Sequence, residues 1–113
     1  MEAITIREPV TGEQIKQMAD LYDGVLIKLA VDVSREILAA GGALHADCEQ
    51  ILLDDGSQQD DIWGADWYPD LNQVGFESLI NIRPGQQNFG FAIRDPALRE
   101  QIELIVRRLL EVE

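Results

Sequence analysis

A chain of 113 residues, 46% of them hydrophobic, has the size of one domain and can bury a core without disulfides or a structural metal. Its single cysteine, Cys48, excludes an intrachain disulfide and a cysteine-based zinc site, and fits a reducing compartment. The formal net charge of −12 disfavours binding to nucleic acid or to an anionic membrane surface.

The acidic residues are concentrated in the middle of the chain. Residues 36–82 contain ten Asp and Glu and no Lys or Arg, so this segment carries −10 of the net charge of −12. There is no basic stripe to compensate, and we expect neither nucleic acid nor a membrane as a partner. Solubility alone accounts for such a charge. A protein partner, if there is one, is expected to be basic.

The start of the chain carries no targeting pattern. Residues 1–4 include neither a basic flank nor the beginning of a long apolar stretch, and no segment approaches transmembrane length. We therefore expect a soluble, cytoplasmic protein that is not exported, with residues 1–113 forming a single domain.

A strand and a helix are predicted first. Residues 3–7 alternate and are rich in β-branched side chains, which favours a short strand. Thr11 and Gln14 form a capping-box pattern that begins a helix, and Gly24 ends it. The apolar face of that helix would consist of Ile15, Met18, Ala19 and Tyr22.

A second strand and a short helix are predicted next. Apolar residues occupy every second position from Val25 to Val33, the period of a strand. Residues 35–40 could continue as strand or turn helical before the glycine pair that follows them. Asp47 is predicted to cap a short helix over residues 48–55.

The second half of the chain predicts a loop, a hairpin and an amphipathic helix. Residues 54–61 are wholly polar and predict an exposed loop. Two apolar strands, 62–68 and 74–82, would form an antiparallel hairpin. Asp95 caps the last helix and Pro96 takes its first position. Its apolar stripe would be Leu98, Ile102, Ile105, Val106 and Leu109.

The order of these elements predicts an α+β fold. We expect an antiparallel sheet with helices packed mainly on one face and an amphipathic C-terminal helix.

One candidate catalytic site is centred on the only histidine, His45. A histidine beside a carboxylate such as Asp47 can act as a general base or bind a metal. Together with Arg35 or Arg83, these residues would suit a small hydrolase or a ligand-binding protein. The capping role predicted for Asp47 competes with this hypothesis, because it would occupy the same carboxylate.

A second candidate site is the acidic loop, which offers oxygen ligands for a divalent cation such as calcium or magnesium. Its spacing does not fit an EF-hand loop, because aligning Gly56 with the invariant glycine places Ile51 and Leu53 at ligand positions. A solvated loop is the competing interpretation. No nucleotide-binding glycine pattern occurs, and we expect no cofactor. The candidate metal ligands are Asp54, Asp55, Asp60 and Asp61.

Three stretches of the chain resemble a known family. They are residues 41–47 (GGALHAD), 55–64 (DGSQQDDIWG) and 80–84 (INIRP). Together they are similar to a family of uncharacterised small bacterial proteins, cyanobacterial ones included, that is classed as a domain of unknown function. The resemblance implies a shared fold over nearly the whole chain and carries over no catalytic role.

Two functional hypotheses follow. The absence of strong enzyme motifs favours an interaction or accessory module, as a homodimer or bound to a basic protein. The alternative is the small hydrolase or ligand-binding protein with its site around His45 and Asp47 and with a divalent cation. The sequence leaves open whether the protein is an enzyme.

Overall fold

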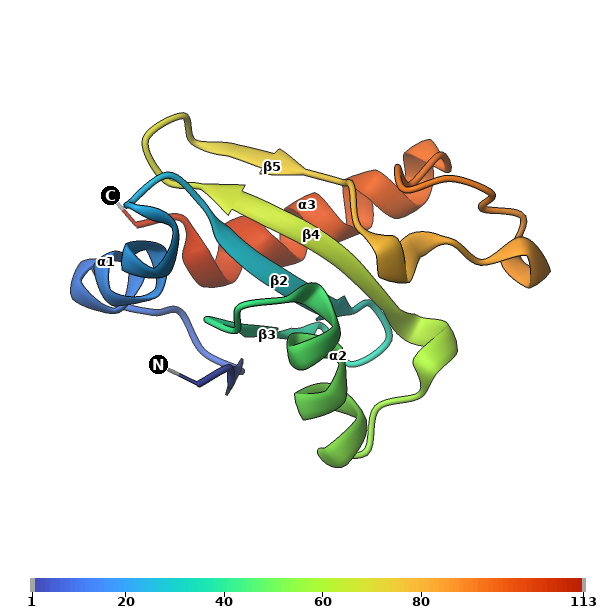
Figure 1. The fold of residues 1–113 in the computed structure, drawn as a ribbon, viewed down its shortest axis with the longest axis horizontal. Coiled ribbons are helices and arrows are strands. Elements are labelled where there is room, and N and C mark those ends of the chain that lie inside the picture. The colour runs from blue at the N-terminus through green and yellow to red at the C-terminus, as the bar shows by residue number, and fades with distance from the viewer. Residues whose placement is uncertain (1, 113) are drawn as a thin grey trace.

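The computed structural model describes residues 2–112 as a five-stranded antiparallel sheet with helices on both faces (Figure 1). The sheet order is β1-β3-β2-β4-β5. The strands are β1 (Ile4–Ile6), β2 (Ile27–Asp32), β3 (Ile37–Ala40), β4 (Ile62–Tyr68) and β5 (Gln73–Gly75), and the α-helices are α1 (Gly12–Ala19), α2 (His45–Asp54) and α3 (Pro96–Leu110).

The predicted α+β class is confirmed, with an antiparallel sheet and a C-terminal helix. Helices α1 and α3 pack on one face of the sheet and α2 on the other, and Figure 1 shows α2 in front of the sheet and α3 behind it. Alternation along β2 directs Leu29 and Val31 toward α3, and Ala30 toward α2. On this α2 face the sheet contacts Cys48 and Leu52 of the helix.

Residues 35–40, left open between strand and helix, form the end of a turn and then β3. The carboxylate of Asp32 accepts hydrogen bonds from the backbone N–H groups of Ser34 and Arg35 at 2.9 and 3.0 Å. Glu36 takes a positive φ of 56°, so the chain reverses tightly and Ile37 pairs with Asp32. The turn therefore separates β2 from β3 and makes them an antiparallel hairpin.

The predicted N-terminal caps of α1 and α3 are confirmed, whereas α1 ends at Ala19, before the predicted Gly24, and is followed by a 3-10 turn over Asp20–Tyr22. Thr11 and Gln14 make both halves of the capping box, and Asp95 accepts from the N–H of Ala97, with Pro96 beginning α3. The prediction for α2 was wrong at its start. The helix begins at His45, three residues earlier than expected, and Asp47 lies in its first turn, where its carboxylate accepts from the N–H of Leu44.

The predicted strand over residues 74–82 was wrong beyond its first residues, because β5 ends at Gly75 and Leu79–Asn81 form a 3-10 turn. Hydrogen bonds from a side chain replace strand pairing here, because the Asn81 amide accepts from the N–H of Gly64 in β4 and donates to its carbonyl oxygen. The predicted strand over 62–68 matches β4.

In the predicted polar loop, Asp54 is the last residue of α2 and Gln59–Asp61 form a 3-10 turn before β4. Ser57 in this loop is buried rather than exposed, and it accepts a hydrogen bond from Arg35. Within residues 2–112, none of the helices has the length and apolar character needed to cross a membrane.

Candidate functional site: a groove beside α2

Two adjoining cavities lie between α2 and the 77–91 segment, and they share Leu79 and Ile80. We call the two together the α2 groove. Their volumes are about 360 Å³ at the end lined by His45 and about 610 Å³ at the end lined by Arg83. His45 and Glu49 are four residues apart on α2, so one face of the helix lines both ends.

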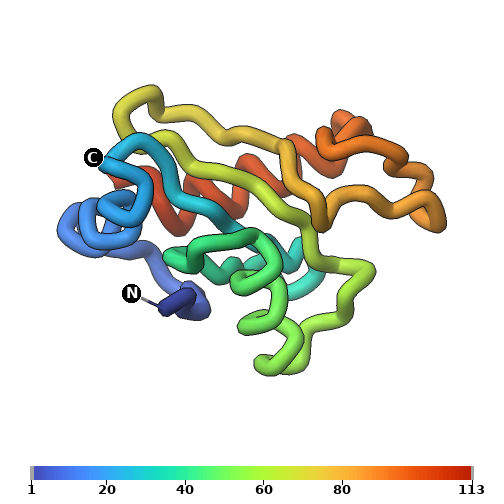
Figure 2. The backbone as a smooth tube through the Cα atoms, in the orientation of Figure 1, coloured from blue at the N-terminus to red at the C-terminus, as the bar shows by residue number. Residues whose placement is uncertain are grey.

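The 77–91 segment is a long loop between β5 and α3, coloured orange in Figure 2. It is closed by short antiparallel bridges, one between Glu77 and Ala92 and one between Arg83 and Asn88. The side chain of Asn88 donates to the carbonyl groups of Asn81, Gly90 and Ala92. These buried hydrogen bonds hold an irregular segment in one shape, so the second wall of the groove is preformed.

His45 is fixed against β4 by two hydrogen bonds. Its Nε2 lies 2.8 Å from Oδ1 of Asp66 and 3.1 Å from the carbonyl oxygen of Ala65. A backbone carbonyl can only accept, so Nε2 carries a proton. Nδ1 makes no hydrogen bond within residues 2–112, which leaves its lone pair open in the neutral ring. The side chains of His45 and Asp66 are 13% and 12% exposed.

Further charges lie at the His45 end. Lys28 and Glu77 line the cavity, and the ammonium group of Lys28 is 5.0 Å from the centre of the Tyr22 ring. Burial raises the pKa of Tyr68, and the negative charges of Asp66 and Glu77 raise it further. The imidazole therefore contacts one carboxylate, and one lysine and one glutamate line the same cavity, within walls that are mainly apolar.

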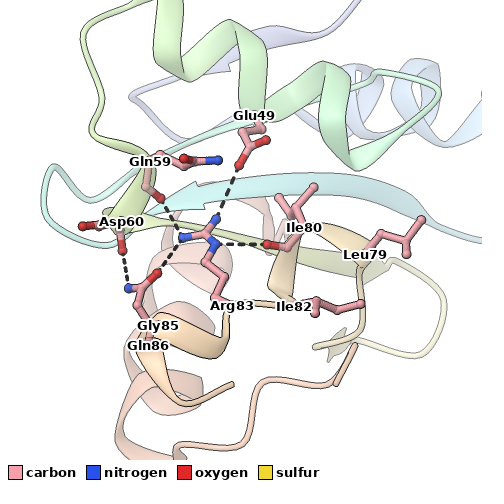
Figure 3. Close-up of a pocket in the computed structure, with 9 residues that line it drawn as sticks. All are labelled: Glu49, Gln59, Asp60, Leu79, Ile80, Ile82, Arg83, Gly85 and Gln86. Carbon is pink, nitrogen blue, oxygen red and sulfur yellow. Dashed lines mark hydrogen bonds and ion pairs between the residues drawn. The ribbon is translucent and has the colours of Figure 1, made fainter. Parts of the chain in front are cut away.

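The Arg83 end is organised by a partly buried guanidinium (Figure 3). Its five N–H groups donate to the carbonyl oxygens of Ile80, Gln59 and Ile62 and to the side chains of Gln86 and Glu49. Burial lowers the pKa of Arg83, and the nearby negative charges of Glu49 and Asp60 oppose that shift. Because every donor is engaged, Arg83 joins the walls of the groove and has no free N–H for an anion.

The structure brings together only some of the residues predicted for the His45 site. His45 and Arg83 line adjoining cavities, but the histidine pairs with Asp66 rather than with Asp47. Asp47 accepts from the backbone of its own helix. Arg35 lies outside the groove, where it donates to Ser57 and Asp55.

The four candidate metal ligands are dispersed. Asp54 accepts from the Gln50 amide, and Asp55 is bound by Arg7 and Arg35. Asp60 and Asp61 lie in the 3-10 turn. Over residues 2–112, no group of three or more His, Cys, Asp or Glu is placed to hold a metal ion.

Two residues of the groove were missed from the sequence, Asp66 and Ser78. Both are buried. Asp66 could have been identified from the sequence, because a carboxylate within an apolar strand is unusual and indicates a specific partner. Ser78 was assigned to a strand, although it caps a 3-10 turn and lines the cavity beside His45. Cys48 lies on the face of α2 that packs against the sheet, and burial raises its pKa to about 11, which keeps the thiol protonated and unreactive.

Comparison with known proteins gives a family but no function. The model of a family described as "Protein of unknown function (DUF5674)" matches residues 4–109. No curated protein and no solved structure matches the chain.

Proposed function

We propose that this chain, which belongs to the DUF5674 family, is an interaction module that binds a segment of a basic partner protein in the α2 groove. The observation that carries the proposal is the gathering of large exposed apolar side chains along the rim of that groove.

Four apolar side chains form this rim. At the His45 end, Leu79 is 73% exposed, Leu44 57% and Phe91 52%, and at the Arg83 end Ile82 is 42% exposed. Single exposed apolar residues are ordinary on protein surfaces. Several of them around one concave site are typical of a surface that a partner covers.

The charge of the groove favours a basic partner. Three carboxylates line the groove, those of Glu49, Asp60 and Glu77, against the two cations Arg83 and Lys28. The excess of negative charge comes from the surrounding segment, which carries −10. A positively charged protein would be steered toward this surface, whereas a second copy, itself at −12, would be repelled. The proposal therefore favours the basic partner over the homodimer. It includes a cytoplasmic setting, which the single buried thiol of Cys48 supports.

The test compares rim variants with a matched control. Leu79→Glu and Phe91→Glu place a charge on the rim, and Leu104→Glu places one on α3, where Leu104 is 65% exposed. Proteins captured from the source cells by the immobilised wild-type chain are identified by mass spectrometry and tested for direct binding after purification. We expect a basic protein whose binding weakens at least tenfold in both rim variants, weakens with salt, and is unchanged in the control.

Two results would contradict the proposal. Equal binding by rim and control variants would remove the groove as the binding surface. A dimer in sedimentation that the rim variants dissociate would show that a second copy, and not a basic protein, occupies the groove.

A further inference from the structure

Ser78 lies directly over Gly64 of β4. A Cβ atom built at Gly64 would come within 2.5 Å of the Ser78 Cβ and 2.6 Å of its Oγ, so only glycine leaves room for the serine. Gly64 faces α2, as does Asp66 two residues further along the strand, at a separation of about 7 Å. His45 is held by Asp66. The serine and the histidine are therefore neighbours along one face of β4.

Their unused hydrogen-bonding groups are complementary. Oγ of Ser78 accepts from the N–H of Ile80 at 3.3 Å, and its own hydrogen has no acceptor in the described part of the chain. His45 instead has an acceptor without a donor, because Nε2 is hydrogen-bonded and the lone pair of Nδ1 has no partner in the described part of the chain. Both residues line the cavity at the His45 end. One open donor and one open acceptor thus share a single cavity.

We propose that Ser78, His45 and Asp66 form a nucleophile, a general base and its positioning carboxylate that hydrolyse esters or thioesters of short apolar acyl groups. This inference goes beyond the binding function and requires no partner protein. These are the roles of a serine–histidine–aspartate triad. Here Nε2 faces the carboxylate and Nδ1 would take the serine proton, the reverse of the usual assignment.

The cavity suits an acyl substrate. Its volume of about 360 Å³ lies within the range for small-molecule sites. Leu44, Leu79 and Phe91 offer apolar contacts for the acyl chain, and Lys28 places a positive charge in the cavity for the oxyanion.

The reaction balances in two halves. Ser78 Oγ bonds to the carbonyl carbon while its proton moves to Nδ1 of His45, and the imidazolium is stabilised by Asp66. The bond to the leaving oxygen or sulfur then breaks, and Nδ1 returns the proton to the leaving group. In the second half, water attacks the carbonyl carbon of the acyl-serine and gives a proton to Nδ1. The bond between that carbon and Oγ then breaks, Nδ1 returns the proton to Oγ, and the free acid leaves.

The test uses a fluorophosphonate probe, which labels activated serines, and p-nitrophenyl butyrate as substrate. We expect a covalent adduct on Ser78, located by peptide mass spectrometry, and turnover of the ester. His45→Gln keeps an amide donor for Asp66 but removes the base, and should lower both rates by at least about 100-fold. Ser34→Ala, an exposed serine outside the groove, should change neither rate.

Asp66 acts through His45, so its variant needs a separate readout. Asp66→Asn should lower kcat and leave KM nearly unchanged, because the carboxylate stabilises the imidazolium that forms in the transition state and does not touch the substrate. Circular dichroism and urea unfolding establish that each variant is folded; Ser78→Ala also loses its cap and is not needed. An unlabelled Ser78, an adduct on His45 instead, or equal labelling of the folded His45→Gln variant would each overturn the inference. None of these outcomes depends on the rim variants that test partner binding.

Discussion

The side chain of Asn81 takes the place of a neighbouring strand for Gly64. Its Oδ1 accepts from the Gly64 N–H at 2.7 Å and its Nδ2 donates to the Gly64 carbonyl at 3.0 Å, both within the buried interior. Strand β5 pairs only with residues 66–68 of β4, so the earlier part of β4 would otherwise lack partners on that side. One amide therefore extends the sheet and attaches the 77–91 segment to it.

Replacing Asn81 by alanine should destabilise the protein by about 2–4 kcal/mol, because each buried backbone group left without a partner costs about 1–3 kcal/mol. Urea unfolding measures the total. Hydrogen exchange at the Gly64 amide measures the local cause, and this amide should exchange far faster in the variant. Unchanged protection of Gly64 would show that Asn81 is not the group that satisfies it.

Replacing Gly64 by alanine should destabilise the protein by about 1–3 kcal/mol through overpacking. The new methyl group would collide with Ser78 and approach Ile80, so the wall of the groove would have to move. Gly85→Ala is the matched control, because a Cβ atom there has no neighbour within 4 Å. Both variants are compared by urea unfolding. Equal stabilities would mean that the 77–91 segment shifts freely over β4.

The sequence predicts the regular elements of this fold well and the groove poorly, for a physical reason. Caps such as Thr11 and Asp95 act within one helical turn, so local patterns reveal them. The partners of Asp66 and Asn81 come from 21 and 17 residues away, and no local pattern specifies those pairings. Residues 74–82 alternate like a strand, yet the buried hydrogen bonds of Asn81 favour a 3-10 turn there. His45 and Arg83 were identified as candidates from the sequence, but the residues that surround them in the groove are brought there by such distant contacts and were not predicted.

Asp55 should make the stability depend on pH in the acid range. Hydrogen bonds from Arg7 and then Arg35 lower its pKa from the ordinary value of 3.8. A carboxyl whose pKa is lower in the folded chain contributes stability above its unfolded pKa, and this contribution is lost as the pH falls through the folded value. Asp55→Asn should therefore be less stable than the wild type at pH 7, and the difference should shrink below a pH of about 3.8.

The measurement for Asp55 is the urea midpoint of both proteins across that pH range, at low and at high salt. The carboxylate is exposed to solvent, so salt should reduce the difference as well. Asp70→Asn, at an exposed position, is the control and should show no such convergence. A difference that stays constant down to pH 2.5, roughly a unit below the ordinary value, would rule out the ion pairs as its cause.

Arg83→Lys should destabilise the protein by about 1–3 kcal/mol although the charge is kept. The guanidinium reaches Ile80, Gln59 and the start of β4 in three directions at once, and a lysine ammonium cannot reproduce that fork. Unpaired carbonyl oxygens would then remain beside the groove. Arg94→Lys, at an exposed arginine just before α3, should be close to neutral.

Urea unfolding gives the size of the Arg83 effect, and tryptophan fluorescence of the folded protein gives its location. The guanidinium lies 4.8 Å from the centre of the Trp63 ring, so its replacement should change the native emission. If both lysine variants matched the wild type in stability and emission, the charge of Arg83 would be sufficient, and its five hydrogen bonds would not be what holds the Arg83 end of the groove together.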